Sequence, residues 1–432
     1  MGLGHFGGGV AAARWLARRG ARVTVTDRAD ERALADSLAV LRDEPIARFH
    51  LGGHREADFR QTDLVVVNPA VRPGSPFLEI ARRAGARLTS ETELFLEACP
   101  ARVIGVTGSN GKSTTAAMTA AILEAAEGRT WLGGNIGSSL LDRLDQIRPD
   151  DWVVLELSSF QLRHLGDGAR VPEVAVVTNC SPNHLDWHES YAHYRAAKQR
   201  ILTGQRAEDL AVLNTFDAEV AAWSPLVRGR HVPLGADDEV PPLAVPGEHN
   251  RRNASCAATT AAAVGCGSRA VRAGLAAFAT LPQRLQPIGR IEGRRLYNDS
   301  SSTTPDSTIA ALAALEGPVW LLAGGTDKGL DFGPLAAAVA GRACGAAFFG
   351  AVGRELHRQV AARAASFPCA AVETMRDALW WCWHRSRPGD SIVLSPACAS
   401  HDQFRNFRAR GEEFVALVEA RGAEGGGMKD EG

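Results

Sequence analysis

The 432-residue sequence lacks an excess of charge of either sign. Its 48 lysines and arginines stand against 49 aspartates and glutamates, which gives a formal net charge of −1 with neutral histidines. No global basic field therefore indicates binding to nucleic acid, and no acidic excess opposes it. We expect any binding to depend on local sites.

The sequence also lacks paired cysteines and long apolar runs. Its eight cysteines are scattered without a CxxC pair, which favours reduced thiols over a disulfide framework or a zinc site. No apolar run reaches the ~18–20 residues that a membrane-spanning helix requires, and no basic segment followed by an apolar one precedes the first motif. We expect a cytoplasmic monomer with no membrane insertion and no nucleic-acid partner.

The most informative segment that is present is GVTGSNGKSTT at 105–115. It follows an apolar run, 101–106, and precedes a helical pattern, 116–126, so a strand, a glycine-rich loop and a helix start follow one another. Backbone N–H groups of such a loop bind phosphate, Lys112 adds a charge near the terminal phosphates, and the Ser113 hydroxyl can hold Mg²⁺. The usual pattern has a further glycine where this chain has Val106, so the loop is a variant. A glycine-rich turn without a ligand is the alternative.

A second glycine-rich turn stands at the start of the sequence. Gly2-Leu3-Gly4-His5-Phe6-Gly7 precedes a helical run, 10–19, and a strand, 21–26, that ends at Asp27. A G-x-G-x-x-G turn with an acid about twenty residues later is typical of dinucleotide binding. The turn should follow a strand, yet only Met1 precedes it. We therefore expect the first strand of this sheet to be missing and an edge of the sheet to be open.

Strands and helices alternate along the rest of the chain. After strands at 63–67 and 87–89, we expect strands at 103–106, 152–157, 174–178 and 211–214, which give a parallel sheet flanked by helices. Further strands are expected at 318–323, 346–349 and 391–394. The predicted fold class is α/β with three domains: a Rossmann-like N-terminal domain at 1–90, a central P-loop ATPase-type domain at 91–282, and a Rossmann-like C-terminal domain at 283–432.

Polar residues at strand ends of the central domain are candidates for chemistry. Glu156 closes the strand WVVLELSS and can supply a second oxygen ligand for Mg²⁺, although a solvated carboxylate is the alternative. His184 and Asp186 follow the next strand, at the sheet edge from which the phosphate loop also emerges. Lys198 lies in YRAAKQRIL, and composition alone makes it an exposed lysine of a surface helix.

Taken together, the motifs resemble those of the Mur ligases. TGSNGKS, LELSSFQL, SPNHLDWH with a lysine ten residues after its second histidine, GEHNRRN, LPQRLQ, NDSSSTTP, LLAGGTDKG and LSPACASHDQFRNFRARG have the order and spacing of that family over nearly the whole chain. The members that the chain most resembles use ATP and Mg²⁺ to join D-glutamate to UDP-N-acetylmuramoyl-L-alanine in the synthesis of peptidoglycan precursors. The resemblance thus implies that the three domains bind the UDP group, ATP and the incoming amino acid.

The resemblance also implies roles for individual residues. Catalytic roles fall to Lys112, Glu156, His184 and Lys198, and metal ligation to Ser113, Glu156, His184 and Lys198, the last as a carbamylated lysine. ATP contacts fall to Gly108, Ser109, Asn110, Gly111, Lys112, Ser113, Thr114, Asn253, Arg284 and Asp299. Contacts with the UDP-muramoyl substrate fall to Gly4, Asp27, Asn135, Ser158 and Ser159, and contacts with glutamate to Thr303, Lys328, Ser400 and Phe407.

One departure from the family concerns the amino acid. The family usually has Asp-Ser-Lys where this chain has Asp299-Ser300-Ser301, so a lysine expected to neutralise a glutamate carboxylate is absent. A Mur-type ligase with another acceptor, such as L-glutamate, is therefore an alternative.

Other classes of protein explain less of the sequence. A ligase similar to folylpolyglutamate synthases would share the ATP loop but not the UDP domain or the SPACAS segment. A NAD-dependent dehydrogenase would explain residues 2–27 alone. A silent nucleotide-binding regulator would not need Lys112, Glu156, His184 and Lys198 together.

Overall fold

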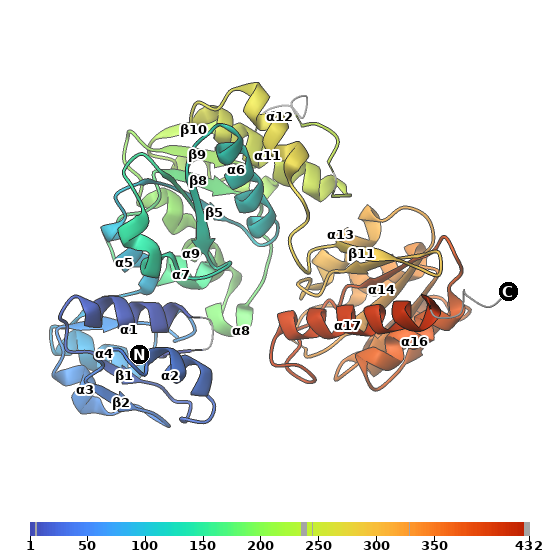
Figure 1. Ribbon diagram of the computed structural model, residues 1–432, viewed down its shortest axis with the longest axis horizontal. Coiled ribbons are helices and arrows are strands. Elements are labelled where there is room, and N and C mark those ends of the chain that lie inside the picture. Colours follow the sequence, from blue (N-terminus) through green and yellow to red (C-terminus); the bar gives the residue numbers. More distant parts are fainter. Residues whose placement is uncertain (5–6, 235–239, 244, 328, 427–432) are drawn as a thin grey trace. The chain divides into compact units, whose positions relative to one another are not determined.

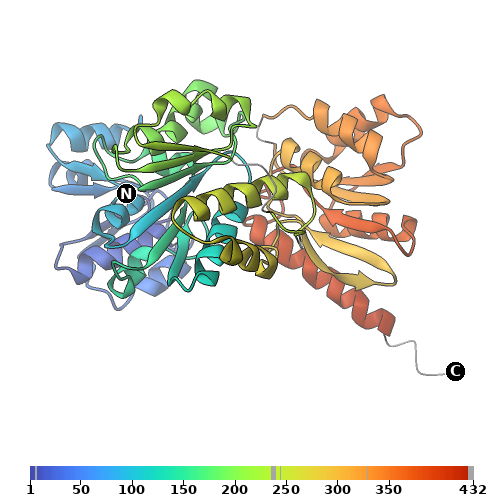
Figure 2. The same cartoon turned by 90° about the horizontal axis from the view of Figure 1, so that it is seen from above.

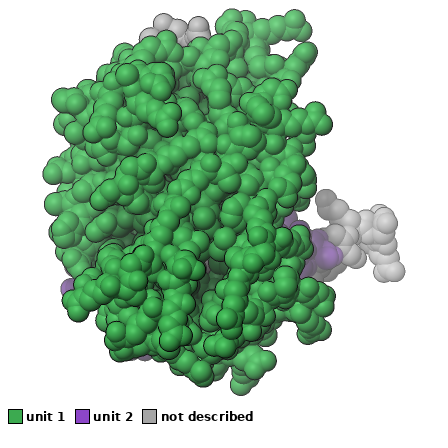
Figure 3. All heavy atoms as spheres, turned by 90° about the vertical axis from the view of Figure 1, so that its left-hand side faces the viewer, with its two compact units in different colours: residues 1–241, 252–277 green, residues 242–251, 278–432 purple. Residues whose placement is uncertain are grey.

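The computed structural model describes residues 1–4, 7–234, 240–243, 245–327 and 329–426. The chain forms two compact units, residues 1–241 with 252–277 (unit 1) and residues 242–251 with 278–432 (unit 2), which Figure 3 colours separately. Both units are α/β, as the sequence predicts. None of the described helices is long and apolar enough to cross a membrane.

The first part of unit 1 holds two pairs of parallel strands. β1 (Thr24–Thr26) pairs with β2 (Arg48–His50), and β3 (Leu64–Val66) pairs with β4 (Arg87–Thr89). The accompanying helices are α1 (Gly8–Arg18), α2 (Ala35–Leu41), α3 (Glu56–Arg60) and α4 (Pro76–Arg83).

The segment before the first glycine turn was expected to leave an edge of the sheet open, and the structure differs from this expectation. No strand is assigned to residues 1–4, as predicted, but their backbone links the two strand pairs. The Met1 amino group donates to the Val66 carbonyl at 2.9 Å, and the Gly2 N–H donates to the Thr26 carbonyl at 2.8 Å. The expected open edge between β1 and β3 is therefore filled by Met1 and Gly2. His5 and Phe6 of the turn lie outside the described residues.

Unit 1 continues as a six-stranded parallel sheet with the order β10-β9-β8-β5-β7-β6. The strands are β5 (Arg102–Thr107), β6 (Thr130–Gly134), β7 (Trp152–Glu156), β8 (Val174–Val177), β9 (Leu210–Leu213) and β10 (Arg230–Pro233). The inner strands β5, β7, β8 and β9 are almost entirely apolar and buried, as expected when helices cover both faces of a parallel sheet.

Two layers of helices bury the faces of this sheet (Figure 1). α6 (Lys112–Ala125) and α11 (Glu248–Ala263) supply apolar side chains to one face, and α12 (Ser268–Ala277) packs on α6. α5 (Glu91–Ala98), η1 (Leu140–Gln146), α7 (Ser159–Arg163) and α9 (Tyr191–Thr203) cover the other face. The short elements are α8 (Leu185–His188), α10 (Ala218–Ala221) and η2 (Ser224–Leu226).

Unit 2 is built on a mixed sheet with the order β11-β12-β16-β13-β14-β15, in which β11 alone of the described strands is antiparallel to its neighbour. The strands are β11 (Gln286–Ile291), β12 (Arg294–Asn298), β13 (Val319–Gly324), β14 (Gly345–Phe349), β15 (Cys369–Ala371) and β16 (Ser391–Leu394). α13 (Pro305–Ala314), α14 (Gly333–Arg342) and α15 (Gly353–Arg363) bury one face, and α16 (Met375–Arg385) and α17 (Phe407–Gly426) bury the other. Figure 2 shows α17 running beside the β11–β12 hairpin.

Candidate active site

The glycine-rich loop of unit 1 lies at the carboxyl end of β5 and is held by the segment that follows β8. The Asn110 N–H donates to the Asn179 side-chain oxygen at 2.8 Å, and the Asn110 carbonyl accepts from the Thr178 hydroxyl at 2.6 Å. Because β5 and β8 are neighbouring parallel strands, their carboxyl ends meet at one edge of the sheet. These hydrogen bonds hold the backbone of the loop at Asn110. This role of Thr178 and Asn179, which stand where the expected strand 174–178 ends, before the SPNHLDWH motif, was not predicted from the sequence.

Two glycines of the loop are required by close approach. Gly108 and Gly111 have φ angles of 152° and 80°. A Cβ atom at Gly108 would lie 2.0 Å from the Thr178 hydroxyl, and one at Gly111 would lie 2.2 Å from the side-chain oxygen of Asn253. These contacts place Asn253 of α11 against the loop. The ATP contact implied for Asn253 stays a prediction, but its neighbourhood agrees with it.

The loop ends at a helix N-terminus that suits an anion. Gly111 caps α6, and the first turn of α6 contains no acidic residue. The N–H groups at the start of a helix and the helix dipole favour negative charge there. The Lys112 amine donates to the Ser109 carbonyl at 2.9 Å, so the cation stays beside the loop. Thr114 follows in the same first turn and is buried.

Ser113 and Glu156 form a buried pair of oxygen ligands. Each side chain is 1% exposed, and the Ser113 hydroxyl donates to the Glu156 carboxylate. The other Glu156 oxygen accepts from the Asn135 side-chain amide at 2.7 Å. Glu156 is therefore not the solvated strand-end carboxylate of the alternative interpretation. Asn135 thus orients this carboxylate, and its predicted contact with the muramoyl substrate stays a prediction.

Mg²⁺ fits these donors. No group of three or more histidine, cysteine or acidic side chains suited to a metal occurs in the described parts of the chain. Mg²⁺ commonly uses one or two protein oxygens and completes its shell with waters and substrate phosphates. The hydroxyl of Ser113 and the carboxylate of Glu156 match that pattern.

Lys198 is buried beside the loop. It is 1% exposed, and its amine donates to the Gly108 carbonyl at 2.6 Å and lies 4.7 Å from the centroid of the Tyr194 ring. Burial, and secondly the charge of Lys112, hold the pKa of Lys198 well below its usual value. The composition-based prediction of an exposed surface lysine is wrong, because α9 turns this residue toward the phosphate loop.

His184 and the two serines after Glu156 lie in a neighbouring cluster. His184 has a φ of 54°, and its ring lies 4.8 Å from that of Phe160. Ser158 caps α7, and Ser159 forms a 2.9 Å hydrogen bond with the buried His188, whose pKa is lowered to about 4 mainly by burial. The metal role of His184 and the substrate roles of the serines stay predictions.

Asp27 binds the backbone of the N-terminal glycine turn. One carboxylate oxygen accepts from the N–H groups of Leu3 at 2.7 Å and Gly4 at 3.2 Å, and the other accepts from Ala29 at 2.8 Å. The acid therefore holds the backbone at Leu3 and Gly4, the start of the turn that was predicted to hold the UDP group. The ligand contacts of Gly4 and Asp27 are untested.

The remaining predicted residues belong to unit 2. Asp299 is buried and accepts from the Leu285 N–H at 2.9 Å and the Ser395 hydroxyl at 2.7 Å. Thr303 follows in the same loop, and Ser400 is buried in the loop after β16. Arg284 precedes β11, Phe407 begins α17, and Lys328 lies outside the described residues.

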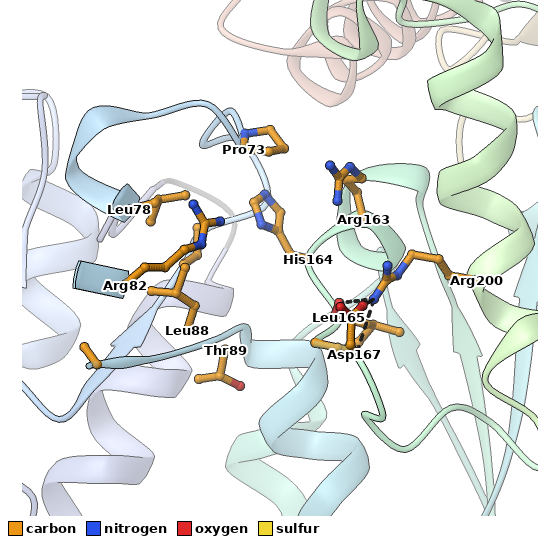
Figure 4. A pocket seen from close by; sticks show the side chains of 13 residues that line it. Pro73, Leu78, Arg82, Leu88, Thr89, Arg163, His164, Leu165, Asp167 and Arg200 are labelled. Carbon is orange, nitrogen blue, oxygen red and sulfur yellow. Dashed lines mark hydrogen bonds and ion pairs between the residues drawn. The ribbon is translucent and has the colours of Figure 1, made fainter. Parts of the chain in front are cut away.

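A cavity of about 300 Å³ lies elsewhere in unit 1, between the β3–β4 segment and the loop after α7 (Figure 4). Arg82, Arg163, His164 and Arg200 contribute to its lining. Three arginines thus line the cavity. One of them, Arg200, donates hydrogen bonds to the backbone carbonyls of Leu165 and Gly166. No described residue predicted to bind ATP or substrate lines this cavity.

Known proteins resemble the chain over its whole length. Curated proteins named UDP-N-acetylmuramoylalanine--D-glutamate ligase from Roseiflexus sp. (strain RS-1) and Anaeromyxobacter dehalogenans (strain 2CP-C) are 36% and 38% identical to it, over 97% and 95% of both chains, respectively. The chain belongs to the Mur ligase family. Three family models match this Mur ligase: "Mur ligase MurD-like, N-terminal domain" at 1–90, "Mur ligase middle domain" at 106–240 and "Mur ligase, glutamate ligase domain" at 283–398.

Solved Mur ligases share its fold. UDP-N-acetylmuramate-alanine ligase MurC from Thermotoga maritima is 20% identical with a TM-score of 0.63, over 97% of this chain and 98% of that one. MurF ligase from Thermotoga maritima, solved in complex with ADP, is 16% identical with a TM-score of 0.60, over 85% and 99%. E. coli FolC, solved with DHPP and ADP, is 18% identical with a TM-score of 0.58 over 76% of this chain. The predicted α/β fold class is confirmed.

Asp299 should make the stability of this Mur ligase depend on pH. Burial raises its pKa from 3.8 to about 6, so folding favours the protonated acid. Its stabilising contribution is complete below about pH 4 and is lost as the pH rises through about 6. We expect the free energy of unfolding, relative to that of Asp299→Asn, to fall by roughly 3 kcal/mol over that window. Urea unfolding across the window measures it.

The control for loss of a charge is Asp306→Asn, at an exposed acid in the first turn of α13. Parallel pH profiles of the wild type and Asp299→Asn would contradict the prediction.

Proposed function

We propose that this Mur ligase joins D-glutamate to UDP-N-acetylmuramoyl-L-alanine at the expense of ATP, in the cytoplasm and as part of peptidoglycan precursor synthesis. The observation that carries the proposal is the gathering of Lys112, Ser113, Glu156 and Lys198 around one glycine-rich loop. The name shared by the full-length relatives supports this choice of substrates. The FolC match supports only the fold, since its identity is low.

The reaction needs activation of a carboxylate. A carboxylate oxygen of the muramoyl substrate attacks the γ-phosphorus of ATP, which forms an acyl phosphate and releases ADP. The amine of glutamate then attacks the acyl carbon, and the tetrahedral intermediate collapses to an amide with loss of phosphate and a proton. Activation by ATP is needed because an unactivated carboxylate has a poor leaving group, whereas an acyl phosphate can release phosphate.

Residues of unit 1 would stabilise the phosphoryl transfer. The loop N–H groups and Lys112 balance the negative charge on the phosphates as it redistributes in the transition state. Ser113 and Glu156 would hold Mg²⁺, which neutralises phosphate charge and orients the γ-phosphoryl group. Asn135 keeps the Glu156 carboxylate in place by its 2.7 Å hydrogen bond.

We also propose that the expected domains divide the substrates. Residues 1–90 would bind the UDP group through Gly4 and Asp27, residues 91–282 would bind ATP, and residues 283–432 would bind glutamate. The fixed turn at Asp27 and the fixed phosphate loop support the first two assignments.

The proposal is tested by phosphate release from ATP and Mg²⁺ with UDP-N-acetylmuramoyl-L-alanine, in the presence of D-glutamate, L-glutamate or neither. We expect release only with D-glutamate, and none from a folded Lys112→Ala variant. Release with L-glutamate alone would identify the alternative acceptor. No release with either enantiomer would contradict the proposed function.

Lys198 is proposed to act as a carbamate. An uncharged amine is the form that adds CO₂, and burial beside Lys112 favours that form. We expect Lys198→Ala to lose nearly all phosphate release and to recover part of it in acetate, which supplies the missing carboxylate. Lys112→Ala is the matched control, because it removes a cation and should gain nothing from acetate. Normal turnover of Lys198→Ala would refute the role.

Ser301 should weaken the binding of glutamate. It is half-buried, and its N–H donates to the Gln283 carbonyl at 3.1 Å. A lysine there could form a charge-assisted hydrogen bond worth ~1.5–3 kcal/mol, or roughly ten- to a hundredfold in affinity. We therefore expect Ser301→Lys to lower the KM for D-glutamate and to change the KM for ATP much less.

Ser366→Lys, at an exposed serine of the same unit, is the control for an added charge. An unchanged or higher KM for D-glutamate in Ser301→Lys would mean that this position does not face the carboxylates of the amino acid.

A further inference from the structure

Unit 2 contains a fully buried arginine whose guanidinium hydrogen bonds go to a hydroxyl and to backbone carbonyls. Arg410 lies in α17 and is 0% exposed. Its guanidinium donates to the Ser300 hydroxyl at 3.0 Å and to the carbonyls of Ser300 at 2.9 Å, Cys398 at 3.1 Å and Ala399 at 3.3 Å. Burial lowers its pKa to about 10, so it remains charged at neutral pH. No aspartate or glutamate in the described residues forms an ion pair with it.

Arg410 joins segments that are distant in the sequence. Ser300 follows β12, whereas Cys398 and Ala399 follow β16. The Ser300 hydroxyl in turn donates to the Phe407 carbonyl at 2.8 Å, which ties in the start of α17. The Ala399 carbonyl also accepts from the Thr326 N–H at 2.8 Å, which ties in the loop after β13. One guanidinium thus lies at the centre of contacts among four segments.

The loop after β16 needs such support. Ala397 has a φ of 62°, in the left-handed region that L-residues seldom adopt, and its N–H donates to the Ser302 carbonyl at 2.9 Å. Arg410 holds the carbonyls of the next two residues. Gly325 leaves the space for this, because a Cβ atom there would lie 2.1 Å from the Ala399 carbonyl. The strained turn is therefore fixed from both sides.

The segments that Arg410 joins carry the residues predicted for the glutamate pocket. Thr303 lies three residues after Ser300, Ser400 follows Ala399, and Phe407 accepts from Ser300. We propose that Arg410 is a positioning residue for the amino-acid pocket, because its planar fork fixes the loops of Ser300 and Ala399 relative to α17. This inference rests on the proposed function, since it assumes that these loops receive the amino acid.

The geometry of the fork is what the proposal requires. Guanidinium presents five N–H donors in a fixed plane, whereas the ammonium of lysine is a single point with three donors. A lysine at 410 would keep the charge but could not hold the hydroxyl and all three carbonyls. Arg410→Lys therefore separates the geometric role of the arginine from its charge.

Steady-state kinetics and hydrogen exchange test this role. For Arg410→Lys we expect the KM for D-glutamate to rise at least about tenfold, while the KM for ATP stays within about twofold. Backbone amides of 300–303 and 397–404 should exchange faster than in the wild type, while β13 and β14 keep their protection. Arg376→Lys, at an exposed arginine on α16, should change neither quantity.

Several results would overturn the proposal. A wild-type KM for D-glutamate in Arg410→Lys would mean that a positive charge at 410 is enough to position the pocket. A parallel rise of the KM values for D-glutamate and ATP would indicate a merely structural role. If Arg410→Lys fails to fold, Ser300→Ala removes only the hydroxyl between Arg410 and Phe407 and should raise the KM for D-glutamate about threefold or more, with the KM for ATP unchanged. An unchanged KM for D-glutamate in Ser300→Ala would also contradict the positioning role of Arg410.

Failure of the proposed function can be distinguished from failure of this inference. A wild-type protein that releases no phosphate with either glutamate would refute the function, and with it the pocket to which Arg410 is assigned. An active wild type with an unaltered Arg410→Lys would refute the inference alone.

Discussion

The hydrogen bonds between the phosphate loop and the segment after β8 are the interaction on which the rest of the site depends. Thr178 and Asn179 bind both backbone groups of Asn110, and Lys198 binds the Gly108 carbonyl. They can do so because β5 and β8 are adjacent parallel strands, so that their carboxyl ends share one edge of the sheet. Hydrogen bonds to three side chains thus hold the backbone of the loop at Gly108 and Asn110.

This arrangement has an electrostatic cost that a polyanion would relieve. Lys112 lies at the N-terminus of α6, and its charge depresses the pKa of the buried Lys198. Two amines and a helix N-terminus close together disfavour additional positive charge. Glu156 is the carboxylate that acts in the opposite direction and raises the pKa of Lys198. Phosphates placed in the loop would reverse the sign of the local field. Burial first, and the charge of Lys112 second, hold the pKa of Lys198 well below that of an exposed lysine.

The sequence predicted the elements whose signals are local. The apolar strands β5, β7 and β8 and the loop before α6 were found within a few residues, because buried parallel strands are continuous apolar runs. Six strands were not predicted: the three-residue strands β2 and β15, and β6, β10, β11 and β12. β6 contains two glycines, β10 is an edge strand, and the β11–β12 hairpin contains Arg290, Arg294 and Arg295, so none of them has a clear apolar pattern.

The burial of Lys198 could have been found from spacing. Tyr194, Ala197, Ile201 and Leu202 form the i, i+3, i+7, i+8 stripe of a buried helix face, and Lys198 is the i+4 member of that stripe. A lysine within such a stripe either points to solvent along its stem or has a specific partner, and here the partner is the Gly108 carbonyl. Composition missed this because it ignores which face of the helix a residue occupies.

Arg410 had no comparable signal, since its partners are backbone carbonyls that any sequence would supply. Its neighbours in FRARG include Arg408, which is exposed, so local composition does not distinguish the buried arginine from the solvated one. Ser300 and Arg410 are separated by 110 residues, and only the packing of α17 on the sheet brings them together. The hydrogen bonds that hold the loops after β12 and β16 thus include several to α17. In unit 2 the geometry of the predicted amino-acid pocket is thus coupled to the packing of a helix that comes after both loops in the chain.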